Sequence, residues 1–388
     1  MTALRFFTAG ESHGSALIGI LEGIPGGLSL SSDDIDKELM RRQTGYGRGG
    51  RMKIEQDHAE IISGVRWGKT IGSPISLFIE NKDWKNWQEG MSSEGRYEHS
   101  ISAVTRPRPG HADLAGILKY AQKDIRNILE RSSARETAAR VAIGAVTKKF
   151  LSEFGIIINS YVIQIGNVRM LKTEAISKEI FQKAEASPVR CPDEETTKKM
   201  IKLIDKAVKN GDSLGGIFEI VATGIPPGLG SHIQWDMKLD ARLSMAISSI
   251  QAIKGVEVGL GFKIAEKFGS EVMDEIFYKR KSGFYRKTNN AGGIEGGMSN
   301  GMPIVIRAAM KPIPTLKKPL RSVDIITREN IKAAYERSDT CAVPAASIIG
   351  EAMTAITIAD ALLEKFGGDS IDETKRNFDA YIEYIKKF

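Results

Sequence analysis

The segment Gly23-Ile24-Pro25-Gly26-Gly27-Leu28 returns in the second half of the chain as Gly224-Ile225-Pro226-Pro227-Gly228-Leu229. A second pair follows in the same order, because Gly72-Ser73-Pro74-Ile75 returns as Gly301-Met302-Pro303-Ile304. Glycine and proline set the geometry of turns, so both pairs mark equivalent turns beside apolar segments. They indicate either a chance similarity of turn sequences or two diverged β/α halves.

An Arg-Ser pair ahead of a predicted helix gives a third landmark. Arg131-Ser132 corresponds to Arg337-Ser338, again in the same order. A chain of 388 residues could form two or three domains of roughly 150 residues each. The ordered landmarks instead favour one pseudo-symmetric α/β domain of the α+β type, with the functional site between its halves. We expect halves at roughly 1–165 and 212–366, and a lysine- and glutamate-rich helical insertion at about 172–210.

Hydrophobic periodicity and capping residues predict the elements around these landmarks. Strands are expected at 74–79, 156–165 and 217–223. Helices are expected from Ser31 to about Met40, at 112–129, from Ser133 to about Gly155, at 237–253, at 345–366 and at 370–386. Five glycines among the 13 residues from Asn289 to Gly301 predict a loop whose backbone can approach a ligand closely.

The overall composition is that of a folded protein. Hydrophobic residues make up 41% and charged residues 27%, which excludes a disordered chain. The two cysteines, Cys191 and Cys341, lie in no metal-binding or redox spacing, which favours a reducing compartment. No stretch reaches the roughly 18 apolar residues of a membrane helix, and the first residues show no signal-peptide pattern. We therefore expect a cytoplasmic protein that does not bind membranes.

The positive charge is concentrated in a few turns. Lysine and arginine number 55 and the acidic residues 48, which gives a net charge of +7 with histidine neutral. The arginines in turns rich in glycine, proline or serine are Arg41, Arg42, Arg48, Arg51, Arg106, Arg108, Arg131, Arg135 and Arg337. Guanidinium groups bind carboxylate and phosphate through paired hydrogen bonds. Nucleic-acid binding would favour a continuous basic stripe with aromatic residues, and aromatic residues make up only 7%, so a small polyanionic ligand fits better.

Two of the five histidines lie in polar turns near arginines. His13 lies in Gly10-Glu11-Ser12-His13-Gly14 and His111 in Pro109-Gly110-His111-Ala112-Asp113. Histidine in such a turn can act as a general acid near neutral pH, and a structural role is the alternative. The remaining histidines, expected to be structural or on the surface, are His58, His99 and His232. No two histidines have a ligand spacing, so we expect no metal site.

Short catalytic motifs leave one further possibility open. The letters of Gly10-Glu11-Ser12-His13-Gly14 match G-x-S-x-G, the nucleophile elbow of Ser-His hydrolases, which needs a strand before it and a helix after it. A hydrolase built on Ser12 therefore stays an alternative, as does a basic nucleic-acid-binding protein. The sequence contains no P-loop motif and no dinucleotide-binding strand–G-x-G-x-x-G–helix unit.

The longer motifs resemble those of the chorismate synthase family and follow the family's order over nearly the whole chain. They are Thr8 to Gly14, Arg41 to Met52, Arg108 to Asp113, Arg131 to Thr137, Ser249 to Glu257, Asn289 to Gly301, Lys311 to Thr315 and Arg337 to Asp339. The resemblance implies a lyase that converts 5-enolpyruvylshikimate 3-phosphate to chorismate and phosphate by 1,4-anti elimination, the last step of the shikimate pathway. It also implies reduced FMN as cofactor, helices sandwiched between antiparallel sheets, and a homotetramer.

The same resemblance implies roles for five catalytic residues. His13 is expected beside the departing phosphate as an acid, and His111 near N1 and O2 of the flavin. Asp339 is expected near flavin N5, where it would assist hydrogen transfer. Ser12 and Ser133 resemble hydrogen-bonding helpers. One departure concerns Thr340, because many relatives carry proline there, and threonine would leave the backbone at Asp339 freer.

Binding residues are implied in the same way. The residues that resemble the substrate clamp are Arg42, Arg48, Arg51, Arg108, Arg135 and Arg337. Arg42 and Arg48 also resemble contacts of the family with NADP. The residues that resemble FMN contacts are Arg131, Ser132, Ser133, Gln251, Ala252, Gly296, Lys311, Pro312, Ile313, Pro314, Thr315 and Arg337. The sequence leaves open whether NADPH or an external flavin reductase supplies the reduced flavin.

Overall fold

The computed structural model describes residues 3–48, 56–171, 176–280, 283–336 and 338–388. Its first sheet is antiparallel and has the strand order β1-β2-β6-β3. These strands are β1 (Arg5–Ala9), β2 (Ala16–Glu22), β3 (Glu60–Ser63) and β6 (Ile75–Glu80). Alternate residues of β2 and β6 are buried, which is the pattern of a sheet with one face on the core.

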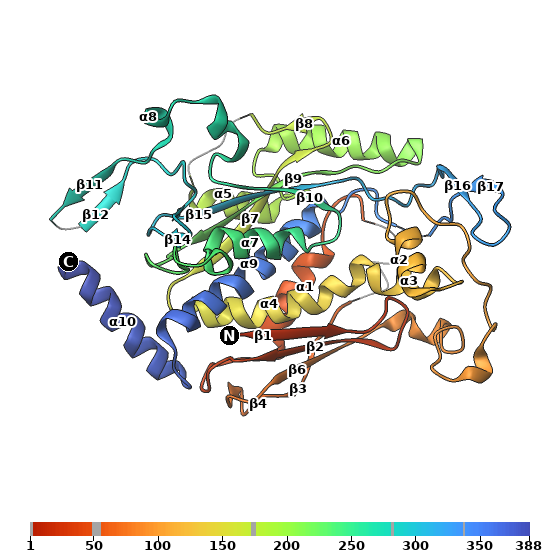
Figure 1. Ribbon diagram of the computed structural model, residues 1–388, viewed down its shortest axis with the longest axis horizontal. Helices are drawn as coiled ribbons and strands as arrows, with labels where there is room; N and C mark the ends of the chain where they lie inside the picture. Colours follow the sequence, from red (N-terminus) through yellow and green to blue (C-terminus); the bar gives the residue numbers. More distant parts are fainter. Residues whose placement is uncertain (1–2, 49–55, 172–175, 281–282, 337) are drawn as a thin grey trace.

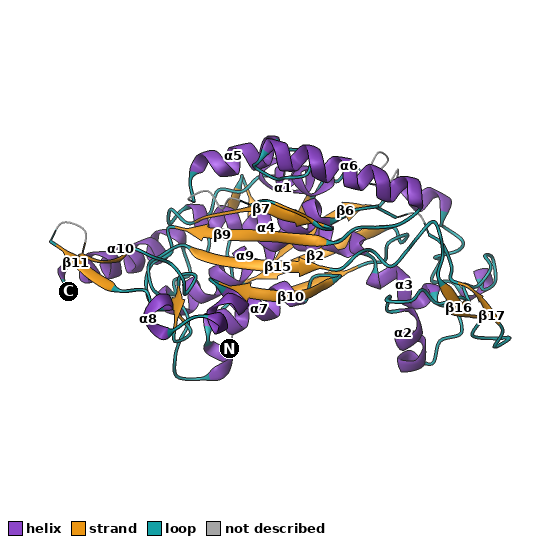
Figure 2. Ribbon diagram, turned by 90° about the horizontal axis from the view of Figure 1, so that it is seen from above, coloured by secondary structure: helices purple, strands orange, loops and turns teal. Residues whose placement is uncertain are grey.

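A second antiparallel sheet lies on the opposite side of the molecule from the first (Figure 1), and Figure 2 shows it from above. Its strand order is β10-β15-β9-β7-β8. Its strands are β7 (Ile157–Ile165), β8 (Val168–Arg169), β9 (Gly216–Thr223), β10 (Ile253–Val258) and β15 (Ile304–Met310). The predicted strands at 74–79, 156–165 and 217–223 are confirmed as β6, β7 and β9. The two sheets do not share a strand, so a separate layer must join them.

Four helices form that layer between the sheets (Figure 1). They are α1 (Ser32–Gln43), α4 (Thr137–Ser152), α7 (Leu239–Ser248) and α9 (Val343–Phe366). α4 packs on β2 and β6, α9 packs on β7 and β9, and the two helices pack on each other. The predicted fold class, with helices sandwiched between antiparallel sheets, is therefore confirmed.

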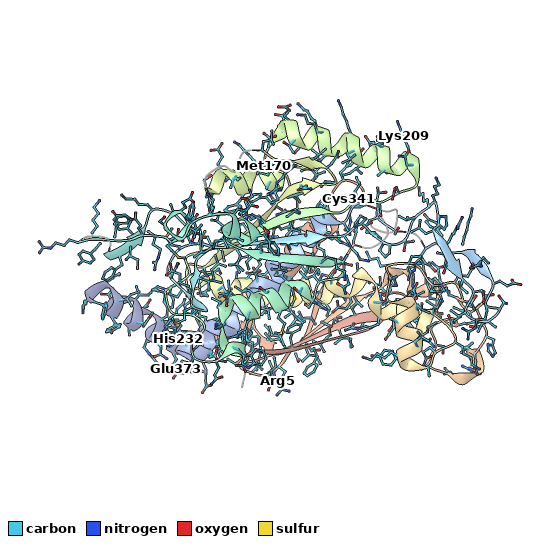
Figure 3. All side chains as sticks on the ribbon, turned by 45° about the horizontal axis from the view of Figure 1, so that its top comes forward. Arg5, Met170, Lys209, His232, Cys341 and Glu373 are labelled. Atoms are coloured by element: carbon cyan, nitrogen blue, oxygen red, sulfur yellow. The ribbon has the colours of Figure 1, made fainter. Side chains whose placement is uncertain are left out.

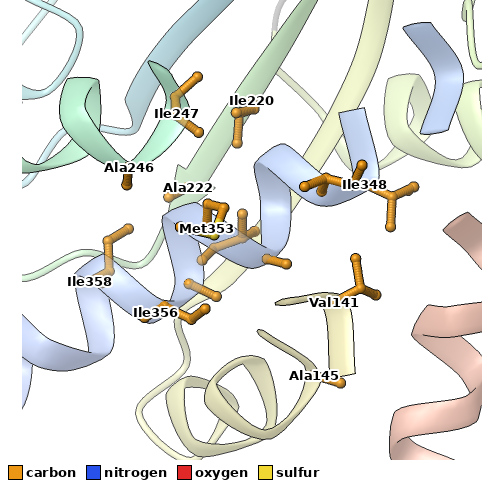
Figure 4. Packing of buried hydrophobic residues seen from close by; sticks show 14 of the residues in the cluster. Val141, Ala145, Ile220, Ala222, Ala246, Ile247, Ile348, Met353, Ile356 and Ile358 are labelled. Carbon is orange, nitrogen blue, oxygen red and sulfur yellow. The ribbon is translucent and has the colours of Figure 1, made fainter. Parts of the chain in front are cut away.

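The helix α9 lies at the centre of the core. Within the described residues it is the one helix long and apolar enough to cross a membrane, and it is buried inside the protein. Figure 4 shows Ile348 and Met353 of α9 among side chains from α4, α7 and β9. α4 and α9 approach closely at Gly144, where an added Cβ would lie 2.6 Å from the Cα of Ala352. Only glycine allows this backbone separation.

The two halves place equivalent elements in the same order. β1, β2, α1, β3, β6 and α4 correspond in turn to β7, β9, α7, β10, β15 and α9, and the corresponding strands have the same neighbours in their sheets. The repeated turn at Gly23 follows β2 and the one at Gly224 follows β9. The division into one domain with halves at 1–165 and 212–366 stays a prediction.

The predicted insertion at 172–210 contains two helices, α5 (Lys178–Ala186) and α6 (Glu194–Asn210), which lie over the second sheet. The Asp193 side chain caps α6 by accepting a hydrogen bond from the backbone N–H of Thr196. The tail helix is confirmed as α10 (Ile371–Lys387).

The predicted helix at 112–129 is two helices. α2 (Asp113–Tyr120) ends at Ala121, whose φ of 53° is left-handed, and α3 (Arg126–Ser132) follows at a new angle. Asp124 causes this break, because its carboxylate accepts hydrogen bonds from the backbone N–H groups of Val104 and Arg126. Hydrophobic spacing continues across the break, so periodicity alone could not reveal it.

Two other boundaries differ from expectation. The predicted helix 237–253 ends as α7 at Ser248, because Ala252 has a φ of 68° and the chain turns into β10. The glycine-rich segment 289–301 contains a short hairpin rather than loop alone, formed by β13 (Ile294–Glu295) and β14 (Met298–Ser299).

Small peripheral elements complete the fold. They are β4 (Val65–Arg66), β5 (Lys69–Thr70), α8 (Gly269–Val272), β11 (Ile276–Lys279), β12 (Gly283–Arg286), β16 (Arg321–Val323) and β17 (Asn330–Lys332). The β11–β12 and β16–β17 hairpins lie at opposite ends of the molecule (Figure 1). His232 lies on the periphery (Figure 3), and the side chains of His58 and His99 are 65% and 90% exposed, as expected for surface histidines. Cys191 and Cys341 are buried, free thiols.

Candidate active site

A cavity of about 970 Å³ gathers most of the candidate residues. Its walls come from segments far apart in the chain, among them the β1–β2 turn, the residue stretch after α1, the start of α4 and the start of α9. The candidate residues that line it are Ser12, His13, Arg42, Arg48, Arg108, His111, Ser132, Ser133, Arg135, Gln251, Ala252, Lys311, Ile313, Pro314, Thr315 and Asp339. Both halves contribute, as the repeat suggested.

Some candidates are not among the lining residues. Arg131 donates hydrogen bonds to the carbonyl oxygens of Thr8 and Gly10, and Gly296 lies in the turn between β13 and β14. Pro312 is absent from the lining although its neighbours belong to it. Arg51 and Arg337 lie outside the described residues. The roles predicted for these residues, and for those that do line the cavity, stay predictions.

The most unusual electrostatic feature of the cavity is a carboxylate shared by two arginines. Asp57, whose side chain is fully buried, lies 2.5 Å from Arg135 Nη1 and 3.4 Å from Arg42 Nη1. Arg42 also donates to Thr137 and to the carbonyl of Ala134. Arg42 and Arg135 thus bring two buried guanidinium groups to the cavity, where they share the Asp57 carboxylate.

The pKa of Arg42 is lowered to about 10. Burial is the largest cause, and the positive charges of Arg48 and Arg135 add to it, whereas the negative charges of Asp57 and Asp339 oppose it. Arg48 also lines the cavity and pairs with Asp339 at 3.1 Å. An anion bound among these arginines would return the stabilisation that burial removes.

Asp339 is held in place by its neighbour. The backbone N–H of Thr340 donates to the carbonyl of Gly47 at 2.9 Å, a hydrogen bond that proline could not make. The expectation that threonine frees the backbone at Asp339 is therefore wrong for this structure. The extra hydrogen bond ties the segment before α9, which carries Asp339, to the turn next to Arg48.

His13 is fixed from two sides. Its Nδ1 lies 2.8 Å from the buried Glu130 carboxylate, which also accepts the backbone N–H of His13 at 2.8 Å. The ring of Trp87 lies against the imidazole, with 4.2 Å between ring centroids. Beside it, the hydroxyl of Ser12 is 3.1 Å from that of Ser133. The sequence analysis missed Glu130 and Trp87, because neither belongs to a recognised turn motif.

His111 has a similar carboxylate partner. Its Nδ1 lies 2.5 Å from Asp113, which also accepts hydrogen bonds from the backbone and guanidinium of Arg108. Burial alone would raise the pKa of Asp113, but the hydrogen bonds from His111 and Arg108 outweigh burial and hold it well below its usual range. Arg108 in turn donates to Thr315 at 3.1 Å. A signal for Asp113 was present, since it lies two residues after His111.

Apolar side chains form part of the cavity lining, here called the apolar wall. It consists of Leu129, Ile250, Ala252, Met310, Ile313, Pro314, Ala342, Ala345, Ala346 and Ile349. Gln251 donates to Glu136, but its Oε1 atom is buried without a hydrogen-bond partner among the described residues. Lys311 lies next to this wall and donates to the carbonyl of Gly110. Burial, with the nearby charge of Lys254, lowers the pKa of Lys311.

The Ser-His hydrolase alternative lacks its structural context. Residues 10–14 join the antiparallel strands β1 and β2, whereas a nucleophile elbow joins a strand to a helix. Ser12 is 2% exposed, and its hydroxyl meets that of Ser133. Among the described residues, no group of three or more His, Cys, Asp or Glu side chains could hold a metal ion.

Comparisons with known proteins agree with this geometry. The family model described as chorismate synthase matches residues 4–363. The chain is 60% identical to a chorismate synthase of Aquifex aeolicus and 57% identical to one of Geobacter sulfurreducens, over 99% of this chain and at least 99% of each relative. A crystal structure of chorismate synthase, 49% identical, superposes with a TM-score of 0.81 and 99% coverage of both chains. This chain belongs to the chorismate synthase family.

Proposed function

We propose that the 970 Å³ cavity is where this chain, a lyase of the shikimate pathway, converts 5-enolpyruvylshikimate 3-phosphate to chorismate and phosphate by 1,4-anti elimination. The observation that carries the proposal is that four arginines, Arg42, Arg48, Arg108 and Arg135, line this one cavity. Guanidinium groups gathered at one cavity suit an anionic ligand. The proposed substrate has a phosphate and two carboxylates, which suit several guanidinium groups.

The arginines that would bind the substrate come from different segments of the chain. Arg42 and Arg135 both hydrogen-bond to Asp57, and Arg48 and Arg108 belong to other segments that line the cavity. A charge-assisted hydrogen bond is stronger than a neutral one, and convergent guanidinium groups fix the orientation of a rigid ring. We include Arg51 and Arg337 in the clamp by the family resemblance alone.

The apolar wall and its polar edge fit reduced FMN. A flavin ring suits a wall of alanine, isoleucine and proline, and the buried Oε1 of Gln251 offers an unused acceptor to a ring N–H. The residues proposed to hold FMN are Arg131, Ser132, Ser133, Gln251, Ala252, Gly296, Lys311, Pro312, Ile313, Pro314, Thr315 and Arg337. When bound, the reduced flavin supplies electron density and takes up the ring hydrogen.

The protein's own residues then act on protons and charge. His13 donates a proton to the departing phosphate, because a phosphate leaves more readily when its developing charge is neutralised. Asp113 holds His111 at Nδ1, where His111 can act on the flavin pyrimidine edge. In this proposal Asp339, which pairs with Arg48, assists hydrogen transfer, and Ser12 and Ser133 supply hydrogen bonds.

The setting of the reaction is also a proposal. We infer a cytoplasmic homotetramer that contacts neither nucleic acid nor membrane. Arg42 and Arg48 would contact NADPH if this chain reduces its own flavin, and an external flavin reductase would serve otherwise.

The decisive test is an anaerobic assay of chorismate formation with reduced FMN. It is repeated with NADPH and oxidised FMN to identify the reductant. His13→Ala and His111→Ala should each lower kcat by about 10²-fold, which is at the low end of the contribution of a general acid. No chorismate with reduced flavin, together with strong salt-dependent DNA binding, would reverse the proposal in favour of a nucleic-acid-binding protein.

A further inference from the structure

Glu130 is buried behind the cavity wall and does not line it. Its side chain is 2% exposed, and it lies in the last turn of α3. Each hydrogen bond described for its carboxylate is accepted from nitrogen. The donors are the backbone N–H of His13 at 2.8 Å, Nδ1 of the same residue at 2.8 Å, and Nη1 of Arg126 at 3.2 Å.

The hydrogen bonds keep Glu130 ionised. Burial by itself would raise its pKa, but the hydrogen bond and charge of His13, followed by the charge of Arg126, lower it below the ordinary value. An ionised carboxylate has acceptors only. A neutral imidazole beside it must therefore carry its single proton on Nδ1, and Nε2 is then the unprotonated ring nitrogen.

Trp87 and Arg126 fix the plane of the ring. The indole of Trp87 lies against the imidazole at 4.2 Å with an angle of 32° between the planes. The guanidinium of Arg126 lies 4.8 Å from the centroid of the same indole, and also pairs with Glu336 at 3.8 Å. Trp87 is held further by donating to Asp83. The acidic and basic groups around His13 thus form one connected cluster.

We propose that Glu130 is the positioning residue of His13. By holding Nδ1–H it orients the ring so that Nε2 faces the departing phosphate; the imidazolium donates its Nε2 proton there, and the neutral Nδ1–H tautomer remains. The inference rests on the proposed function, because it assigns the supporting partner of the proposed acid. Glu130 touches neither substrate nor cofactor in this arrangement. It acts through His13, as a carboxylate that orients a catalytic imidazole does in other enzymes.

Glu130→Gln tests the proposal because an amide cannot replace the carboxylate here. The new NH₂ group must face a donor of Arg126 or of His13 in any orientation. Only Nδ1 can become an acceptor, by moving its proton to Nε2. We therefore expect the neutral His13 ring to switch from the Nδ1–H to the Nε2–H tautomer in this variant.

The tautomer is measured directly, without substrate or flavin. Protein labelled with ¹⁵N-histidine gives ring signals from five histidines, and those of His13 are assigned by their loss in His13→Asn. At a pH where the ring is neutral, wild type and Glu130→Asp should show Nδ1–H, and Glu130→Gln should show Nε2–H. Glu153→Gln is the matched control, because Glu153 pairs with Lys375 on α10 and should leave both tautomer and rate unchanged.

In the anaerobic assay, Glu130→Gln should lower kcat by about 10- to 100-fold with KM within about threefold, because a mispositioned acid affects the transition state more than binding. An Nε2–H tautomer in wild type, or an unchanged tautomer and rate in Glu130→Gln, would overturn the inference. If Glu130→Gln does not fold, the wild-type spectrum and Glu130→Asp decide. A tautomer switch in an enzyme that makes no chorismate would refute the proposed function instead.

Discussion

Replacing Asp57 with asparagine removes the one carboxylate that Arg42 and Arg135 share. Both arginines are at most 7% exposed, so neither can recover its hydration in the variant. Removing one partner of a buried ion pair costs about 3–5 kcal/mol, because the remaining charge is left uncompensated. We therefore expect Asp57→Asn to lower the free energy of unfolding by about 3–5 kcal/mol.

The loss in free energy of unfolding can be converted to a change in melting temperature, because the unfolding entropy scales with chain length. Unfolding entropy is roughly 2.1 cal/mol/K per residue, or about 0.8 kcal/mol per degree for 388 residues. We therefore expect Asp57→Asn to melt about 4–6 °C below wild type. Excess inorganic phosphate should raise the melting temperature of the variant more than that of wild type, since an anion can take the place of the lost carboxylate.

The assay is thermal unfolding followed by circular dichroism, with and without phosphate. Asp379→Asn, on the exposed side of α10, is the matched control and should change stability by less than about 0.5 kcal/mol. Equal melting temperatures for Asp57→Asn and wild type would refute the stabilising role of the shared carboxylate. So would an equal response of the two proteins to phosphate.

Two further predictions concern the core. Glu351 in α9 is fully buried and pairs with Arg41, Lys148 and Arg190, so Glu351→Gln should cost about 3–5 kcal/mol in urea unfolding at neutral pH. Burial would raise the pKa of Glu351, but these cations lower it below the value of about 4.3 in the unfolded chain. The cluster therefore contributes its full stability above that pH and loses it as the pH falls further. The difference in free energy of unfolding between Glu351→Gln and wild type should shrink in acid. An undiminished difference at low pH would contradict this. Gly144→Ala should lower the free energy of unfolding by about 1–3 kcal/mol, because the added methyl group meets Ala352. Gly95→Ala is the control and should be nearly neutral, because a methyl group there points into open space. Equal melting curves for the two variants would contradict the close contact of α4 and α9.

Local sequence predicted a helix or strand well where the pattern of side chains within that segment was sufficient. The periodicity of α9 and the strand pattern of β7 and β9 follow from side chains within one element. The repeated turns at Gly23 and Gly224 lie after equivalent strands, because glycine and proline fix turn geometry locally. The break after α2 was not predictable in this way, since it depends on Asp124 reaching the backbone of Val104.

The candidate site shows the same difference between local signals and long-range contacts. The sequence by itself indicated the arginine clusters and the two histidines, and its longer motifs indicated the family. The expectation that all these arginines lie in turns was wrong, because Arg41 and Arg42 belong to α1 and Arg131 to α3. Only the tertiary structure paired His13 with Glu130 and brought Asp57 to Arg135, partners 117 and 78 residues apart in the chain. The physical reason is that propensity and spacing act over a few residues. An ion pair in the core is decided by how sheets and helices pack and by how much water they exclude.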